Sequence, residues 1–318
     1  MNEIPKIAVV VPCYRVKDQV LNVLSAMPEN VWRIYCVDDA CPDGSGKLIQ
    51  AESKDTRVKT LFHETNQGVG GAVITGYKQA LEDGADIVVK IDGDGQMDPA
   101  LIDAFTAPVI EGACDYTKGN RFYNVEDVKT MPPLRLAGNA ALSFMTKLSS
   151  GYWNVFDPTN GYTAIRADVL KVLPLEKLDK RYFFESDILF RLNVLRAVVR
   201  DVPMRAIYAE EESNLKISRI LLPFFAGHMR NFTKRIFYNY FLRDFSIASV
   251  ELLLGLVLLP FGLIFGALEW SHSTALGVPA SAGTVMLSAL PVIIGVQFLL
   301  SFLHYDIAAV PQNRLKYA

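Results

Sequence analysis

The sequence predicts an α/β domain with a doubly wound sheet, followed by two transmembrane helices. Through the first two thirds of the 318-residue chain, short apolar runs alternate with segments of helical periodicity. These runs are continuous rather than alternating with polar residues, which is typical of parallel strands covered by helices on both faces. Two much longer apolar runs lie in the last quarter of the chain and indicate a separate membrane segment.

The expected elements follow this pattern in chain order. We expect strands at residues 7–11, 33–37, 58–62 and 87–91, and helices at residues 16–27 and 69–81. Ligands of doubly wound sheets bind at the carboxyl ends of the strands. The first candidates for a binding site are therefore the residues that directly follow the apolar runs, namely Pro12, Tyr14, Asp39, Asp92 and Asp94.

Charge is unevenly distributed along the chain. The net charge is only −2, so no global field would draw the protein onto nucleic acid, and no nucleic-acid partner is expected. After Asp244 the charged residues are Glu251, Glu269, Asp306, Arg314 and Lys316. The part before them has the composition of an ordinary soluble domain, and it opens on a core strand rather than on a cleavable signal.

Residues 246–268 and 284–305 are the two apolar runs, and each is long enough to cross a hydrocarbon core of about 30 Å. A pair of buried helices in a soluble domain is disfavoured because neither run has a polar face. Basic residues flank the pair, whereas residues 269–283 contain no Lys or Arg. The positive-inside rule then predicts a multi-pass protein of the cell (inner) membrane with the N-terminal domain and both termini in the cytoplasm.

Residues 217–244 connect the domain to the first span. Apolar and aromatic residues recur there at near-helical spacing, with Arg230 and Lys234 on another face. This pattern predicts amphipathic juxtamembrane helices in contact with membrane lipid, although a surface helix of the soluble domain would show the same pattern. The expected divisions are 1–216 for the cytoplasmic domain, 217–244 for these helices and 245–318 for the transmembrane hairpin and its cytoplasmic tail.

The segment Asp92-Gly93-Asp94-Gly95-Gln96 follows the last of the predicted strands. It places two carboxylates at one strand end, and its glycines let the backbone approach a ligand closely. Hard oxygen ligands suit Mg²⁺ or Mn²⁺, which is usually bound through one or two carboxylates together with substrate phosphates. A solvated acidic turn is the alternative, but the position after a buried strand favours a metal and diphosphate site.

Residues 66–72 (NQGVGGA) are compared with the dinucleotide fingerprint GxGxxG. Counting from Gly68 or Gly70 puts Val73 or Thr75 in place of the third glycine, so a nicotinamide enzyme is disfavoured. Small residues at the start of this helix still permit close approach to a nucleotide.

Taken in order, seven motifs resemble inverting family 2 glycosyltransferases of the A-type fold: VVPCY, VDDACPDGSG, NQGVGGA, DGDGQMDP, GNRF, DPTNGY and ESNLKISR. Within that family they resemble the polyprenyl-phosphate glycosyltransferases, which include dolichyl-phosphate mannose synthases and bactoprenol glucosyltransferases. The resemblance covers about residues 5–220, and the two spans resemble those of the bacterial branch.

The resemblance implies roles for individual residues. The nucleotide-sugar site would be formed by Pro12, Tyr14, Asp39, Gly71, Asp92, Gly93, Arg121 and Lys216. Asp94 and Gln96 would hold the metal. Asp157 is the first candidate for catalysis, and Glu185 and Asp187 are the second candidates. An arginine common in the family is replaced by Thr163, so the substrate phosphate would depend on Arg121, Arg135 or Arg166.

The expected reaction transfers one hexose, with UDP-glucose as the expected donor, to undecaprenyl phosphate or another polyprenyl phosphate at the cytoplasmic membrane face. The phosphate acceptor is largely dianionic near pH 7, because the second pKa of a phosphate monoester is about 6, so Asp157 would position groups more than remove a proton. Two alternatives are a processive polysaccharide synthase, disfavoured by the absence of QxxRW and of further spans, and a non-catalytic membrane sensor of sugar nucleotides. Gly255, Gly262 and Gly266 would let the spans pack against those of a second copy in a homo-oligomer.

Overall fold

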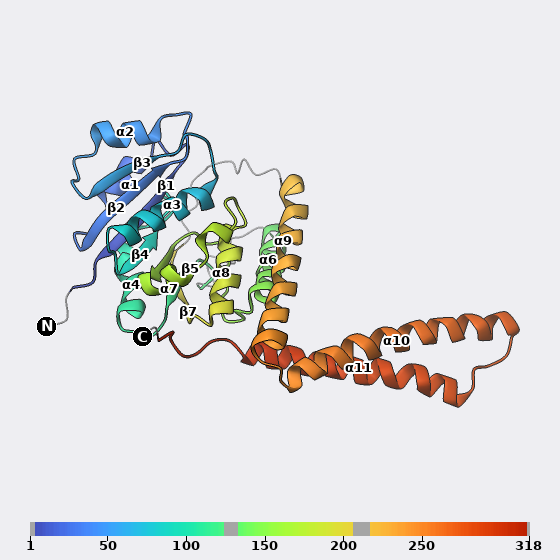
Figure 1. Cartoon of the computed structure of the whole chain (residues 1–318). Helices are drawn as coiled ribbons and strands as arrows, with labels where there is room; N and C mark the ends of the chain where they lie inside the picture. The colour runs from blue at the N-terminus through green and yellow to red at the C-terminus, as the bar shows by residue number, and fades with distance from the viewer. Residues whose placement is uncertain (1–3, 124–132, 206–216, 317–318) are drawn as a thin grey trace. The chain divides into compact units, whose positions relative to one another are not determined.

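The computed structural model describes residues 4–123, 133–205 and 217–316. The chain divides into two compact units, of which the first comprises Met1–Arg235 together with Pro311–Ala318 and the second comprises Ile236–Val310. Figure 1 shows a sheet with helices in the first unit and a helical hairpin in the second.

The first unit contains a seven-stranded sheet of order β3-β2-β1-β4-β6-β5-β7. Its strands are β1 (Ile7–Cys13), β2 (Val31–Asp38), β3 (Val58–Phe62), β4 (Ile87–Lys90), β5 (Tyr116–Asn120), β6 (Thr163–Arg166) and β7 (Val199–Pro203). The helices are α1 (Val20–Ser25), α2 (Ser45–Glu52), α3 (Val69–Glu82), α4 (Ile102–Ile110), α6 (Pro133–Ser150), α7 (Ala167–Val172), α8 (Phe184–Leu195) and α9 (Ile217–Phe237), with short 3₁₀ turns at Pro99–Leu101 and Leu175–Lys177.

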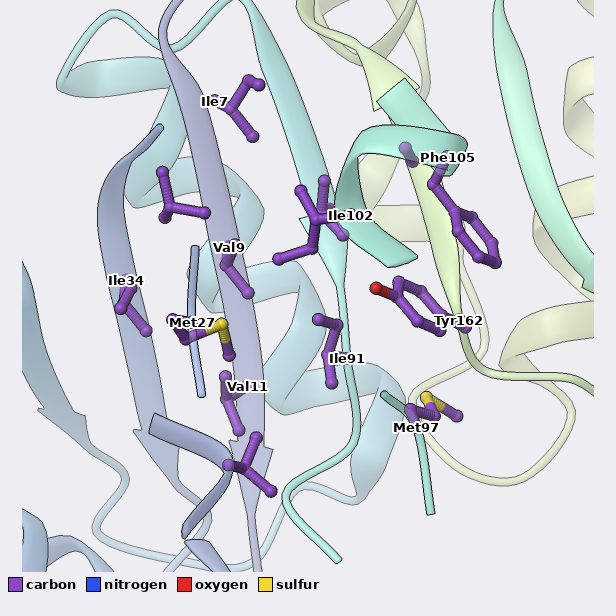
Figure 2. Packing of buried hydrophobic residues seen from close by; sticks show 14 of the residues in the cluster. Ile7, Val9, Val11, Met27, Ile34, Ile91, Met97, Ile102, Phe105 and Tyr162 are labelled. Atoms are coloured by element: carbon purple, nitrogen blue, oxygen red, sulfur yellow. The ribbon is translucent and has the colours of Figure 1, made fainter. Parts of the chain in front are cut away.

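The sheet is covered on both faces, which confirms the doubly wound class. Every residue of β1 is buried, and its side chains alternate between the two faces. Val9 and Val11 belong to a core cluster that includes Phe105 of α4 (Figure 2). Val10 faces α3 so closely that a Cβ at Gly76 would lie 2.3 Å from it. Burying one such aliphatic side chain contributes roughly 1.5–3 kcal/mol.

Two details differ from the expectations. The sheet is mixed rather than wholly parallel, because β6 runs antiparallel to β4 and to β5. The chain reaches β6 from the carboxyl edge of the parallel strands, so it must run back across the sheet. The first helix begins at Val20 rather than near residue 16, because Arg15 has a left-handed φ of 58° and a turn at Val16–Gln19 precedes the helix.

The second unit consists of a π-helical turn at Tyr238–Arg243 and the helices α10 (Ile247–Leu276) and α11 (Ala282–Ala308). Both are long and apolar enough to cross a membrane, with mean hydropathies of 2.3 and 2.2. Gly255 and Gly262 face α11, since a Cβ there would lie 2.7 Å from Leu299 and from the carbonyl oxygen of Ser288, respectively. A Cβ at Gly266 would lie 2.2 Å from the Ser288 hydroxyl, so all three glycines are used within the hairpin.

Candidate active site

The carboxyl ends of β1, β2 and β4 lie at one edge of the sheet. Since β1 lies between the other two strands, Pro12, Asp39 and Asp92 are brought to this edge together. Tyr14 follows β1 and is 43% exposed. The structure thus gathers the candidates for the nucleotide pocket that follow these three strands.

Asp39 is engaged by its own chain. Its Oδ1 accepts a hydrogen bond from Gln67 N at 2.8 Å and lies 2.7 Å from His63 Nδ1. Its Oδ2 accepts from Gly68 N at 2.8 Å. Asp39 therefore fixes the start of α3, and a contact between this carboxylate and a ribose remains a prediction.

The glycines of NQGVGGA allow α3 to pack closely on the segment before α8. A Cβ at Gly68 would lie 2.5 Å from Lys180 O, and one at Gly70 would lie 2.4 Å from Asp179 O. Gly71 N donates to Lys180 O at 3.0 Å, and a Cβ at Gly71 would lie 2.6 Å from Gln67 Cβ. These close approaches are made by the protein's own backbone, which the sequence comparison with a nucleotide fingerprint did not foresee.

The turn after β4 contains Asp92, Asp94 and Gln96, whose side-chain oxygens can act as metal ligands, and it lies next to a buried lysine. Gln96 N donates to Asp94 Oδ1 at 3.0 Å, which closes the turn. Asp92 Oδ1 lies 2.8 Å from the ammonium of Lys90, whose side chain is 1% exposed. Gly93 lies against Val11 and Val16, at Cβ distances of 3.2–3.3 Å, so this turn rests directly on the core.

Lys90 also meets the second catalytic candidate. Its Nζ lies 3.2 Å from Glu185 Oε1, at the first turn of α8. Burial alone would lower the pKa of Lys90, but the carboxylates of Asp92 and Glu185 outweigh it and raise that pKa above its usual value. The lysine is therefore a permanent cation beneath the turn.

The side-chain oxygens of this turn are suitable ligands for a divalent cation that arrives with a nucleotide. Over the described ranges of the chain, no group of three or more His, Cys, Asp or Glu side chains could hold a metal alone. Mg²⁺ and similar ions are usually held by one or two carboxylates, with substrate phosphates and water completing the shell. Asp94, with Gln96 and Asp92 near it in the turn, offers such an incomplete set of oxygen ligands.

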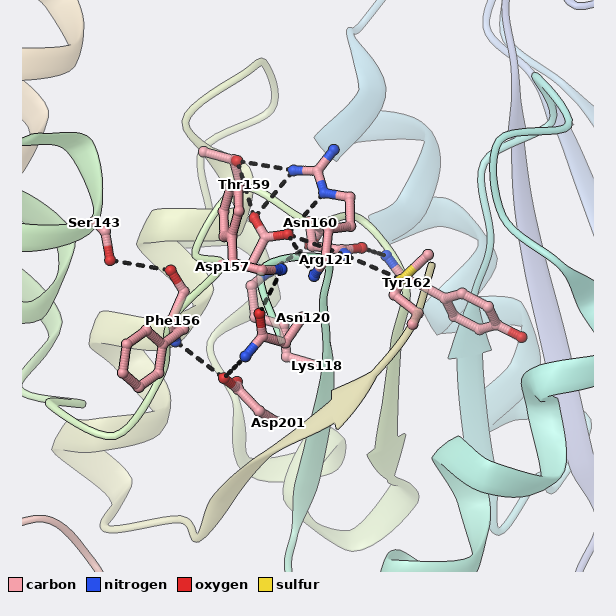
Figure 3. Close-up of polar contacts among 12 residues, drawn as sticks. Lys118, Asn120, Arg121, Ser143, Phe156, Asp157, Thr159, Asn160, Tyr162 and Asp201 are labelled. Carbon is pink, nitrogen blue, oxygen red and sulfur yellow. Dashed lines mark hydrogen bonds and ion pairs between the residues drawn. The ribbon is translucent and has the colours of Figure 1, made fainter. Parts of the chain in front are cut away.

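Asp157 and Arg121 form the second part of the site (Figure 3). Arg121 Nε donates to Asp157 Oδ2 at 2.7 Å, and Nη2 donates to Oδ1 at 3.0 Å. The carboxylate is fully buried, whereas the arginine side chain is 30% exposed. A two-point contact of this kind fixes the plane of the guanidinium, which suits recognition of a phosphate.

The loop that contains Asp157 is held in place by side chains of β5 and β7. Lys118 of β5, which is fully buried, donates from Nζ to Asn160 O, and Asn160 Nδ2 lies 3.4 Å from Asp157 Oδ2. Burial lowers the pKa of Lys118 to about 8, against the opposing effect of the Glu185 and Asp157 carboxylates. Asp201 of β7 accepts from Phe156 N at 3.0 Å, and burial raises its pKa to about 6.

Other candidates lie elsewhere. Asp187 connects α8 to α9, since its Oδ1 accepts from Asn231 Nδ2 at 3.0 Å and its Oδ2 accepts from Arg191 Nε at 3.0 Å. Arg166 ends β6 at the opposite edge of the sheet, paired with Asp115, so the expectation that it meets the substrate phosphate is corrected. Lys216 and the side chain of Arg135 lie outside the described residues.

Sequence reasoning missed both buried lysines. Lysine is almost never fully buried unless it is paired, so a lysine inside an apolar strand was an available signal. Lys90 ends the run IVVK, and Lys118 lies in the middle of YTKGN.

The mixed sheet, with acidic groups at the carboxyl edge of its parallel strands, has the architecture of the A-type glycosyltransferase fold. The sequence pattern described as "Glycosyl transferase family 2" matches residues 8–173, so the chain belongs to this family. It is accordingly a glycosyltransferase.

Several relatives act on polyprenyl phosphates by name. The chain is 35% identical over 218 residues to a UDP-N-acetylglucosamine–dolichyl-phosphate N-acetylglucosaminyltransferase of Methanococcus voltae, covering 64% of this chain and 86% of the relative. It is 32% identical over 187 residues to an undecaprenyl-phosphate mannosyltransferase of Micrococcus luteus, covering 58% and 75%.

Among solved structures, a glucosyl-3-phosphoglycerate synthase of Mycobacterium tuberculosis, with Mn²⁺, UDP-glucose and phosphoglyceric acid, has a TM-score of 0.55. It shares 16% identity, over 73% of this chain and 79% of the other, which establishes the likeness of the fold.

Proposed function

We propose that the protein transfers a single hexose from a UDP-sugar, with UDP-glucose as the first donor to test, to a polyprenyl phosphate such as undecaprenyl phosphate. One observation carries the proposal. The buried carboxylate of Asp157 fixes Arg121 at the same edge of the sheet as the DGDGQ turn, and the same chain has a candidate membrane hairpin. The names of the Methanococcus and Micrococcus relatives support a polyprenyl-phosphate acceptor.

On the donor side, the residues after β1, β2 and β4 bind the nucleotide. Asp94 and Gln96, with Asp92 beside them, would hold Mg²⁺ or Mn²⁺, which would supply positive charge to offset the negative charge developing on the leaving diphosphate. The Mn²⁺ and UDP-glucose of the mycobacterial synthase structure support this assignment.

On the acceptor side, Arg121 binds the lipid phosphate and Asp157 keeps the guanidinium in place. The acceptor oxygen is already ionised, so it needs orientation rather than deprotonation. Glu185 forms an ion pair with Lys90, so it affects the site indirectly, through the lysine that also contacts Asp92. A single in-line displacement by the phosphate oxygen would invert the anomeric centre.

Contacts of the C-terminal tail support the proposed membrane arrangement. Residues 311–316 return to the first unit, where Leu315 N donates to Asp115 Oδ2 at 3.1 Å and Arg166 Nη2 donates to Leu315 O at 2.8 Å. Both ends of the hairpin thus lead into the glycosyltransferase domain, which supports two crossings with the domain and the C-terminal tail on one side of the membrane. The basic residues that flank the hairpin favour the cytoplasmic side. On α9, Leu222 and Phe225 are 75% and 50% exposed, which suits a helix in the headgroup layer.

The test is release of UDP by the detergent-purified full chain with Mn²⁺ or Mg²⁺, using several UDP-sugars and GDP-mannose, with and without undecaprenyl phosphate. We expect release that requires both metal and lipid phosphate, and the fastest donor names the sugar. An inverted anomeric configuration of the product by NMR would support the in-line displacement. Nucleotide binding without turnover for every donor would instead indicate a sensor, and products longer than one sugar would indicate a processive synthase.

A further inference from the structure

Two buried lysines lie in one row of the sheet. Lys90 of β4 and Lys118 of β5 are both register partners of Thr163 on the intervening strand β6. Side chains at paired positions of neighbouring strands project from the same face, so both lysines project from the face that α3 and α8 cover. Their exposures are 1% and 0%. Burying an ammonium group is costly unless it is paired and hydrogen-bonded, so these two positions need a reason.

Lys90 contacts the donor side of the site. Its Nζ lies 2.8 Å from Asp92 Oδ1 and 3.2 Å from Glu185 Oε1. A Cβ at Gly161 would lie 2.4 Å from this nitrogen and 2.5 Å from Asp92 Oδ2, so the backbone there closes over the pair. Without the ammonium, the Asp92 carboxylate would lose the ion pair that holds it in place, and it would also face the Glu185 carboxylate across a low-dielectric space and be repelled. Both effects would move the DGDGQ turn, and the first would remain even if Glu185 were neutral.

Lys118 contacts the acceptor side. Its Nζ donates to Asn160 O, in the loop whose Asp157 orients Arg121. The next position is closely packed as well, since a Cβ at Gly119 would lie 2.7 Å from Asn160 Nδ2. Lys118 is 0% exposed, so an apolar replacement would leave the buried Asn160 carbonyl short of a donor.

We propose that the two lysines divide the support of the site between them: Lys90 positions the turn that binds the metal and diphosphate, and Lys118 positions the loop that binds the acceptor phosphate. The assignment of the two sides rests on the proposed function. Neither lysine touches a substrate in this arrangement, so both are positioning residues. The proposal predicts that their substitutions weaken different substrates.

The experiment compares Lys90→Met with Lys118→Met, a matched pair of buried lysines from nearby strands, in the full-length protein. Calorimetry gives the dissociation constant of UDP with Mn²⁺, and turnover gives the KM for undecaprenyl phosphate. Lys90→Met should weaken UDP–Mn²⁺ binding by about tenfold or more and change the lipid KM by less than about twofold. Lys118→Met should raise the KM for undecaprenyl phosphate by about tenfold or more and change the dissociation constant of UDP–Mn²⁺ by less than about twofold. Equal losses of both affinities in both variants would overturn the proposal.

Folding needs separate variants, because removing one partner of a buried pair leaves an uncompensated charge. The double variant Lys90→Met/Glu185→Gln removes both charges, so its thermal stability should recover while UDP–Mn²⁺ binding stays weak, since Asp92 still lacks the ammonium. Recovery of binding in this variant would show that Lys90 only balances Glu185. Lys118→Gln keeps a neutral donor for Asn160 O and should restore the lipid KM; a value as poor as that of Lys118→Met would reject the hydrogen bond as the cause.

The proposed roles of Lys90 and Lys118 can be rejected independently of each other. UDP–Mn²⁺ binding requires no acceptor, so it tests Lys90 even if the lipid is wrong. Absence of any lipid-dependent turnover by the unchanged protein would reject the proposed function together with the role of Lys118. Unchanged UDP–Mn²⁺ binding by Lys90→Met, in an otherwise active enzyme, would reject the role of Lys90 alone.

Discussion

The two edges of the sheet each contain a fully buried aspartate paired with an arginine, and the two arginines differ in exposure. At the carboxyl edge, Asp157 holds Arg121, whose side chain is 30% exposed. At the amino edge, Asp115 holds Arg166, whose side chain is 8% exposed and which also donates to the backbone of Leu315. The two pairs therefore differ in what they leave accessible. Arg121 is partly exposed at the edge where we propose that the acceptor phosphate binds, whereas Arg166 is buried and holds the C-terminal tail against the sheet.

The largest expected effect comes from the same substitution made at each edge. Arg121→Lys keeps the charge but loses the two-point contact that fixes the guanidinium plane. We expect kcat/KM for the lipid phosphate to fall by roughly 10- to 100-fold, as for loss of a charge-assisted hydrogen bond, with little change in Tm. Arg166→Lys serves as the control and should keep kcat/KM within about twofold. Equal activity of the two variants would remove the functional distinction between the edges.

Arg166→Lys should show its effect in stability instead. The lysine cannot contact both Asp115 and Leu315 O with the geometry of a guanidinium, so the tail is held less firmly. A loss of roughly 1–3 kcal/mol would lower the Tm of a domain of this size by a few degrees. Thermal unfolding of both lysine variants measures this, and a larger drop for Arg121→Lys would contradict the comparison.

Asp157→Asn sharpens the role of the carboxylate at the carboxyl edge. An asparagine still accepts one hydrogen bond from Arg121, so the guanidinium stays near its position but is held less firmly. We expect kcat to fall by about tenfold, with UDP–Mn²⁺ binding unchanged. A near-total loss of turnover with Arg121 still able to bind phosphate would mean that the carboxylate takes part in the chemistry itself.

The smallest effect is a dependence of stability on pH at the carboxyl edge. Burial raises the pKa of Asp201 to about 6 from 3.8, so the folded state binds more protons than the unfolded state between these values. This contribution is greatest below about pH 4 and is lost as the pH rises through 6. Asp201→Asn does not titrate, so its Tm should improve relative to the unchanged protein between pH 4.5 and 7.5.

Much of the fold could be predicted from the sequence because apolar runs fix buried strands and spans. Residues 58–62 were predicted as a strand and form β3, and the run at residues 87–91 gives β4. The reversed strand β6 could not be predicted, since a short buried strand has the same composition in either direction. Its direction depends on where the preceding loop enters the sheet.

The site was predicted as a set of residues but not as an arrangement. The position of Asp92 and Asp94 after a buried strand was enough to propose the metal turn. The pairing of Arg121 with Asp157 joins residues 36 positions apart with no periodicity between them, so only the folded chain reveals it. The sequence likewise gave no sign that Lys90 would lie between Asp92 and Glu185, because α8 supplies one partner from far along the chain.

The contact between Asp115 and Leu315 joins residues 200 positions apart and encloses the whole hairpin. A chain grows from its N-terminus, so Asp115 is made long before its partner, and the hairpin must be synthesised in between. The contact between Leu315 and Asp115 can therefore form only after both apolar helices of the hairpin have been made. Completion of the domain's fold thus follows synthesis of the hairpin, and a chain that stops before residue 315 leaves Asp115 and Arg166 without the tail that covers them.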